Sequence, residues 1–145
     1  MWTTYCNCLG FFFNFFQVHL NGDYECLNKY DGRGLTDATF KSTLDKFLQG
    51  DKVALIRSLT DKLGRLRSVL QTLDSFRFHT CSLLVAYDAS APQEADVRLI
   101  DFAHSTHSGV GSAAVPAYQG PDTDFIEGLS SLMTILEAIM REATG

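Results

Sequence analysis

The sequence predicts an α+β domain, an antiparallel sheet packed with helices, and three observations support this class. Asn21 and Gly22 lie between two short apolar segments, which is a strong hairpin signal because both residue types tolerate positive φ. Residues 96–103 alternate with a period of two, as in a half-buried strand. Residues 52–73 and 124–141 repeat apolar side chains at steps of three and four, which is typical of helices with one apolar face.

The first elements in chain order are the two strands of the hairpin, residues 16–20 and 23–27. Residues 29–34 form a loop with two glycines. Thr36 or Asp37 then caps a helix, since either side chain accepts hydrogen bonds from the N–H groups of a first turn. This helix ends at Gly50, and its apolar face consists of Phe40, Leu44, Phe47 and Leu48.

The second helix is expected over about residues 52–73. Two strands follow, at about residues 76–87 and 96–103, joined by a loop that contains Pro92. Residues 105–120 are rich in Ser, Gly and Ala, and we expect an irregular loop there.

The last helix is expected over residues 124–141, with Asp122 or Thr123 as its N-cap. Its apolar stripe indicates packing into a core, because the stripe follows the helical period over the whole segment.

The composition is that of a single domain with a buried core. The chain has 145 residues, of which 46% are hydrophobic, and a net charge of -5 at pH 7. This charge disfavours nucleic acid as a partner because phosphate backbones require a basic surface, whereas a small anionic substrate requires only a local basic pocket. The four cysteines form no secreted framework. We therefore expect free thiols and an intracellular location, cytoplasmic, nuclear or both.

Asp101 stands near the end of the strand expected over residues 96–103, where the chain enters a polar stretch. Its neighbours Ile100 and Phe102 are apolar. A carboxylate at a strand end suits a nucleotide-dependent phosphotransferase, because Mg2+ takes hard oxygen ligands and bridges the phosphates of ATP. The pair Asp101-Phe102 also resembles the start of the metal-binding Asp-Phe-Gly of protein kinases. The simpler alternative is a turn or cap residue.

Four segments carry further motifs. They are Asn-Lys-Tyr-Asp-Gly-Arg-Gly within residues 26–35, Cys-Ser-Leu-Leu within 76–88, Ile-Asp-Phe-Ala-His within 97–104 and Asp-Phe-Ile-Glu-Gly-Leu within 120–129. In this order and spacing, residues 17–145 resemble the C-terminal lobe of the inositol polyphosphate kinases, closest to the inositol hexakisphosphate kinases. The resemblance implies a kinase-like fold, ATP and Mg2+ as cofactors and an inositol polyphosphate as phosphate acceptor.

The same resemblance implies roles for individual residues. Asp101 binds Mg2+ with ATP and takes part in catalysis, and His104 donates to an acceptor phosphate or contacts the attacking oxygen. Lys29 and Arg33 supply charge-assisted hydrogen bonds to the phosphates of the substrate. Without the resemblance, the two cations are ordinary loop residues and His104 is a loop His without catalytic duty.

Ser82 is a further substrate-binding candidate. It belongs to the segment that resembles the family's Ser-Ser-Leu-Leu motif, but the preceding position is Cys81, which weakens a two-hydroxyl arrangement. The last segment departs from the family at Glu127 and Ser131, where an aromatic or apolar residue and an Asn would stand. We interpret that segment as structural.

The family's Pro-x-x-x-Asp-x-Lys-x-Gly motif and its nucleotide-gripping N-terminal lobe precede these segments, and nothing in the sequence corresponds to either. We therefore expect a truncated chain that is poorly active or inactive by itself. The alternative function is a catalytically inactive kinase fragment that acts as a weak binding module.

The N-terminal segment differs from the rest. Five of the eleven Phe residues fall within residues 11–16, a run that is too short to span a membrane and lacks the basic region of a signal peptide. Phe codons are pyrimidine-rich, so we hypothesise that residues 1–16 are a non-family extension produced by read-through of an intron into an acceptor site. The alternative is a genuine buried strand, and the sequence of the full transcript distinguishes the two.

Three residues of the same region suggest an alternative, a transition-metal site. Asp101, His104 and His107 carry the ligand types of a two-His, one-carboxylate transition-metal site. Ligands at i, i+3 and i+6 would face one way on a helix, but this segment is a strand that enters a Gly/Ser loop. The sequence thus favours ATP with Mg2+, and stoichiometric iron or zinc in the purified protein would support the alternative.

Overall fold

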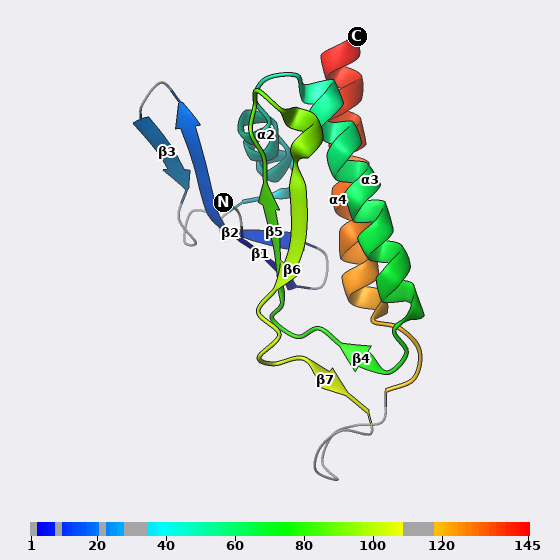
Figure 1. Cartoon of the computed structure of the whole chain (residues 1–145). Helices are drawn as coiled ribbons and strands as arrows, with labels where there is room; N and C mark the ends of the chain where they lie inside the picture. Colours follow the sequence, from blue (N-terminus) through cyan, green and yellow to red (C-terminus); the bar gives the residue numbers. More distant parts are fainter. Residues whose placement is uncertain (1–2, 8–9, 21–22, 28–34, 109–117) are drawn as a thin grey trace.

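A computed structural model describes residues 3–7, 10–20, 23–27, 35–108 and 118–145. Helices α3 (Lys52–Thr72) and α4 (Thr123–Thr144) lie side by side and run in opposite directions, with strands β5 and β6 on one side of the pair (Figure 1). This arrangement of a sheet and helices confirms the expected α+β class.

The sheet has five strands in the order β3-β2-β1-β5-β6, and every neighbouring pair is antiparallel. The strand bounds are β1 Thr3–Asn7, β2 Gly10–Leu20, β3 Asp23–Leu27, β5 Ser82–Ala86 and β6 Asp96–Ile100. Strand β1 joins the two halves of the sheet, since it pairs with β2 on one edge and with β5 on the other.

The predicted hairpin is confirmed. Phe16 pairs with Leu27 and Leu20 pairs with Asp23, so β2 and β3 are in the expected register. The expected turn residues 21–22 lie outside the described residues. Strand β2 begins at Gly10 and continues past the predicted boundary after residue 16, so the Phe run is part of a strand. The origin of residues 1–16 stays a prediction that the transcript tests.

The helices begin at side-chain caps. Helix α2 (Asp37–Phe47) is capped by Thr36 rather than Asp37, and the side chains of Thr36 and Thr39 each accept a hydrogen bond from the other residue's backbone N–H. Asp51 caps α3 by accepting from the N–H of Ala54 at 3.0 Å. Asp122, one of the two expected caps, performs the same task for α4. The negative charges of the two carboxylates also interact favourably with the positive N-terminal ends of the helix dipoles.

The core lies between the helices and the inner face of β5. The stripes predicted for the three helices converge there, because burying apolar surface is the main favourable contribution to folding. Its fully or nearly fully buried members include Leu44, Phe47, Leu48, Leu55, Ile56, Leu59, Leu63, Leu83, Leu129, Leu136 and Ile139. Within the described part of the chain, no helix combines the length and apolar character needed to cross a bilayer.

The prediction of one continuous strand over residues 76–87 was wrong. It is divided into β4 (Phe76–Arg77) and β5, and the chain turns between them at Thr80, which has φ of 59°. Strand β4 pairs with β7 (Thr106–His107), which lies in the segment predicted as an irregular loop. Local composition missed this ribbon because its two strands come from distant parts of the chain.

A second correction concerns the end of β6. The strand ends at Ile100 rather than at Ala103, because Asp101 adopts a left-handed conformation with φ of 64° that extended strands do not allow. The chain then turns back, and the N–H of Ser105 donates to the carbonyl oxygen of Phe102 at 2.9 Å.

The connection between α2 and α3 is hydrogen-bonded to Tyr87, which directly follows the C-terminal end of β5. The Tyr87 hydroxyl accepts from the N–H of Gln49 at 2.9 Å and donates to the carbonyl oxygen of Phe47. Gly50 follows with φ of 78° and lies against Ala89, which precedes the short 3-10 helix η1 (Pro92–Glu94). This corner is therefore closely packed and depends on a glycine.

Candidate functional site

The candidate site is the end of the molecule where β6 stops and the β4–β7 ribbon begins (Figure 1). Ser75, Thr80 and Asp101 are the non-glycine residues with positive φ in the described part of the chain. All three lie at or next to this end. Such conformations cost of order 1–3 kcal/mol each and persist where surrounding contacts enforce them, often at functional sites.

Asp101 is exposed at this end. The predicted alternation of buried and exposed side chains is confirmed for the strand that precedes Asp101, because Val97 and Leu99 pack against the core while Arg98 is exposed. Continued alternation would have placed Asp101 on the core side with Val97 and Leu99. The left-handed conformation interrupts that alternation, so the carboxylate is available to a ligand in solution.

Ser82 is brought next to Asp101 by strand pairing, because Ser82 pairs with Ile100 in the β5–β6 ladder. Its residue surface is only 1% exposed. Buried hydroxyls are normally engaged with neighbouring polar groups, so this position is better suited to supporting the site than to touching a substrate. Its predicted substrate role stays a prediction.

Cys81 connects the start of β5 with the turn after Asp101. Its Sγ atom lies 3.1 Å from the Oγ atom of Ser105. Burial raises the pKa of the Cys81 thiol; the contact with Ser105 opposes this shift, and the nearby carboxylates of Asp101 and Asp122 add to it. The thiol therefore stays protonated at neutral pH. Cys81 is a free, buried cysteine, in agreement with the free thiols expected from the sequence.

His104 is exposed on the turn that follows Asp101, three positions along the chain. His107 instead lies in β7, with its ring centroid 4.3 Å from that of Phe76. Among the described residues, no three His, Cys, Asp or Glu side chains are grouped so that they could hold a metal ion. Asp101, His104 and His107 therefore do not form the transition-metal site considered above.

The remaining two candidates, Lys29 and Arg33, lie outside the described residues. Their proposed contacts with substrate phosphates stay predictions.

The structure also places two further polar residues, Arg77 and Asp122, at this end of the molecule, and the sequence did not single them out for the site. The guanidinium of Arg77 lies 4.6 Å from the ring centroid of Tyr118 and donates to the carbonyl oxygens of Gln119 and Gly120. Asp122 accepts hydrogen bonds from the first turn of α4 and from Phe78, in the segment between β4 and β5. Sequence patterns predicted the capping by Asp122, but its second contact and those of Arg77 join residues more than 40 positions apart.

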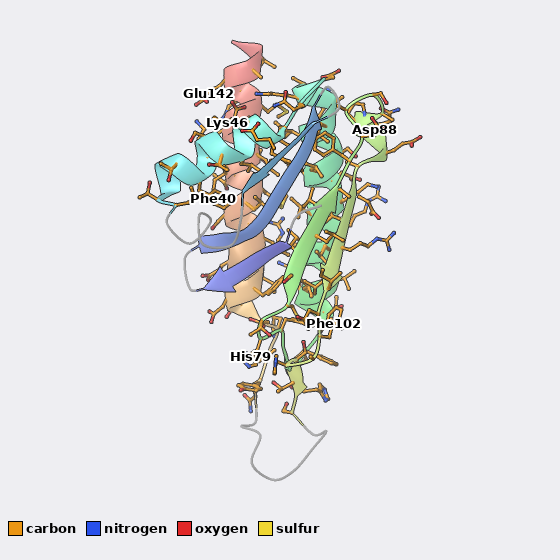
Figure 2. The ribbon with its side chains drawn as sticks, turned by 90° about the vertical axis from the view of Figure 1, so that its left-hand side faces the viewer. Phe40, Lys46, His79, Asp88, Phe102 and Glu142 are labelled. Carbon is orange, nitrogen blue, oxygen red and sulfur yellow. The ribbon has the colours of Figure 1, made fainter. Side chains whose placement is uncertain are left out.

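Aromatic side chains pack between these groups. The ring of Phe78 contacts the rings of Phe76, Phe102 and Phe125, with centroid distances of 6.2, 6.3 and 5.9 Å. Phe102 is 52% exposed in spite of this contact. Figure 2 shows Phe102 and His79 at the same end of the molecule, opposite Asp88.

The exposed Asp101 carboxylate fits a Mg2+ ion that is held mainly by other groups. Mg2+ commonly keeps several waters and binds proteins through one or two carboxylates together with substrate phosphates. A single accessible carboxylate at a strand end meets that requirement. The geometry thus places an accessible carboxylate at this end of the molecule.

Comparison with known proteins identifies the family. A family model described as inositol polyphosphate kinase matches residues 2–137. The chain therefore belongs to the inositol polyphosphate kinase family. The match begins within the segment that was predicted to be a non-family extension, and it includes Ser82, Asp101 and His104.

Curated relatives are inositol hexakisphosphate kinases. Inositol hexakisphosphate kinase 3 of Mus musculus is 32% identical over 153 residues, covering 91% of this chain and 38% of the relative. Inositol hexakisphosphate kinase 1 of Mus musculus is 31% identical over 162 residues, covering 83% of this chain and 37% of the relative. The chain thus spans less than half the length of these relatives.

Solved structures show the same fold. One inositol phosphate multikinase superposes with a TM-score of 0.74 at 22% identity, covering 90% of this chain and 62% of that chain. Another, from S. cerevisiae and in complex with ADP and Mn2+, has a TM-score of 0.74 at 19% identity and covers 91% of this chain and 64% of that chain. The expected fold, antiparallel strands packed with helices as in the inositol phosphate kinases, is confirmed.

Proposed function

We propose that this chain provides the metal-binding, acceptor-binding lobe of an ATP-dependent kinase that transfers phosphate to an inositol polyphosphate. The observation that carries this proposal is the exposed, left-handed Asp101 at the end of β6, within the matched family region. The complex of the yeast multikinase with ADP and Mn2+ supports ATP and a divalent ion as the cofactors.

Asp101 would hold Mg2+ through its carboxylate. When bound, Mg2+ neutralises charge on the phosphates of ATP, which is the main electrostatic requirement of phosphoryl transfer. His104 would act beside it, on an exposed turn where the imidazole can donate to an acceptor phosphate or contact the attacking oxygen. The lobe mainly positions the reacting groups, because phosphoryl transfer needs little covalent chemistry from the protein.

Lys29 and Arg33 would hold the phosphates of the acceptor. Replacing both with Ala is expected to raise the apparent KM for inositol hexakisphosphate far more than the KM for ATP, because the two cations are proposed to contact only the acceptor. Steady-state kinetics of the full-length enzyme, with each substrate varied in turn, measure this difference. A matched replacement of Arg57 and Arg65, both exposed on α3, should leave both KM values unchanged. Equal increases for ATP and acceptor in the Lys29 and Arg33 variant would place these cations elsewhere.

The alternative function is a non-catalytic fragment that binds weakly. Polypeptide 1–145 is expected to show little or no turnover, because the lobe described here contains the metal-binding acid but not the groups that grip ATP in the family.

An assay with labelled ATP and inositol hexakisphosphate tests both functions. Residues 1–145 should be compared with a protein in which the upstream lobe of an inositol hexakisphosphate kinase is joined before them. Turnover only in the joined protein supports the kinase proposal, and comparable turnover of both proteins contradicts the expected inactivity. Absence of turnover in a joined protein that folds would favour the binding module.

A further inference from the structure

We propose that Asp122 is a positioning residue for the metal-binding carboxylate of Asp101. It fixes the connector between β4 and β5, against which the turn after Asp101 is packed. This inference rests on the proposed function, because it assigns to Asp122 a role in the geometry of the same site.

The first observation is that Asp122 uses both of its carboxylate oxygens within the protein. Its Oδ1 atom accepts from the N–H of Phe125 at 3.2 Å, which caps α4, and its Oδ2 atom accepts from the N–H of Phe78 at 2.8 Å. Asp122 is 8% exposed. A buried carboxylate needs such partners because an unpaired buried charge is very costly. One side chain therefore ties the start of α4 to the β4–β5 connector.

The connector leads to Asp101 along two short paths. In the first, the ring of Phe78 packs against the ring of Phe102, whose centroid lies 6.3 Å away and which directly follows Asp101. Phe78 also contacts Phe125 in the first turn of α4, at 5.9 Å. The backbone bond from Asp122 and these two ring contacts hold Phe78 in one place.

The second path runs through Cys81. The N–H of Cys81 donates to the carbonyl oxygen of Phe78 at 3.4 Å, and its Sγ atom lies 3.1 Å from Ser105 Oγ on the far side of the Asp101 turn. Thr80, which lies between Phe78 and Cys81 in the sequence, has a positive φ. The connector is therefore strained, and it keeps its shape because the contacts at both of its ends enforce it.

These contacts should affect the orientation of Asp101 as well as the stability of the fold. Asp101 has positive φ of its own, so its orientation also depends on neighbours that prevent relaxation to ordinary backbone angles. Loss of the bond between Asp122 and Phe78 should loosen the connector and the Asp101 turn together. The helix would remain capped, because a single side-chain oxygen is enough for an N-cap.

The residue Asp51 supplies a matched control. It caps α3 with the same backbone angles as Asp122, φ of -73° and ψ of 87°, and accepts from Ala54 at 3.0 Å. Asp51 is exposed and directly precedes α3, whose start lies at the opposite end of the helical pair from the start of α4 (Figure 1). Asp122→Asn and Asp51→Asn each retain one capping oxygen, because Asn is a strong N-cap. Only Asp122→Asn places an amide NH2 opposite a second backbone N–H.

The experiment compares these two variants in the full-length enzyme. Asp122→Asn should accelerate amide exchange at Phe78 and Cys81, and alkylation of Cys81 by a neutral maleimide, by about tenfold or more over Asp51→Asn. It should also raise the Mg2+ concentration for half-maximal turnover about tenfold, as is common when a group that orients a metal ligand is lost. The KM for inositol hexakisphosphate should change much less. Serine is shorter than Asp but also caps helices. If the bond to Phe78 is responsible, Asp122→Ser should reproduce the faster amide exchange, the faster alkylation and the higher Mg2+ requirement.

Three outcomes overturn the proposal. Exchange and alkylation equal to those of Asp51→Asn would show that Asp122 does not hold the connector. A loosened connector with an unchanged Mg2+ requirement would leave Asp122 with a purely structural role, while the kinase function of the lobe would stand. A fully active Asp101→Asn enzyme would remove the metal-binding function itself and the positioning role with it.

Discussion

Asp101→Asn is expected to lower turnover of the full-length enzyme by orders of magnitude with little loss of fold. Asn keeps the size and shape of Asp and removes the charge that would hold Mg2+. Asn is also among the residues that best tolerate positive φ, so the left-handed conformation at position 101 is retained. Steady-state kinetics at saturating ATP and inositol hexakisphosphate measure the effect, and a thermal melt measures the fold.

Asp96→Asn is the control for this prediction. Asp96 lies at the other end of the same strand, and its Oδ2 atom accepts from Arg98 Nε at 2.7 Å. The hydrogen bond from Arg98 lowers the pKa of Asp96, but water reaches both side chains, so the pair contributes little to stability. Turnover of Asp96→Asn should therefore be normal. Near-normal turnover of Asp101→Asn as well would rule out the metal role of Asp101.

Gly50→Ala is expected to give the largest loss of stability among conservative changes at the described glycines. Gly50 has φ of 78°, and a Cβ atom there would lie 2.8 Å from the carbonyl oxygen of Ala89 and 3.3 Å from its Cβ atom. The left-handed conformation costs an L-residue about 1–2 kcal/mol, and overpacking against backbone adds about 1–3 kcal/mol. The free energy of unfolding, measured by urea titration, should fall by about 2–5 kcal/mol.

Gly120→Ala separates these two costs. Gly120 has a similar φ of 71°, but a Cβ atom there would meet nothing within 4 Å. Its replacement should lower the free energy of unfolding by about 1–2 kcal/mol, the cost of the backbone conformation alone. If the two variants lose equal stability, the close approach of Gly50 to Ala89 is not a constraint, and the corner between α2 and α3 can adjust.

Several elements could be predicted because their signals are local. Helices α2, α3 and α4 follow from apolar residues spaced three or four apart, and side chains at that spacing share a face whatever the rest of the chain does. The hairpin of β2 and β3 follows in the same way from two turn residues. The acidic residue at the end of β6 was also identified from its neighbours, and the family resemblance then gave it a chemical role.

Local sequence signals were enough to predict the fold class, the helices and the identity of the metal-binding candidate, because periodicity and motif spacing act within a few residues. How that candidate is presented depends on contacts between distant parts of the chain. The pairing of Phe76 with His107, the bond from Phe78 to Asp122 and the left-handed turn at Asp101 join or depend on distant segments. No local pattern specifies such contacts, since they form only when the core has already brought β4, β7 and the start of α4 together.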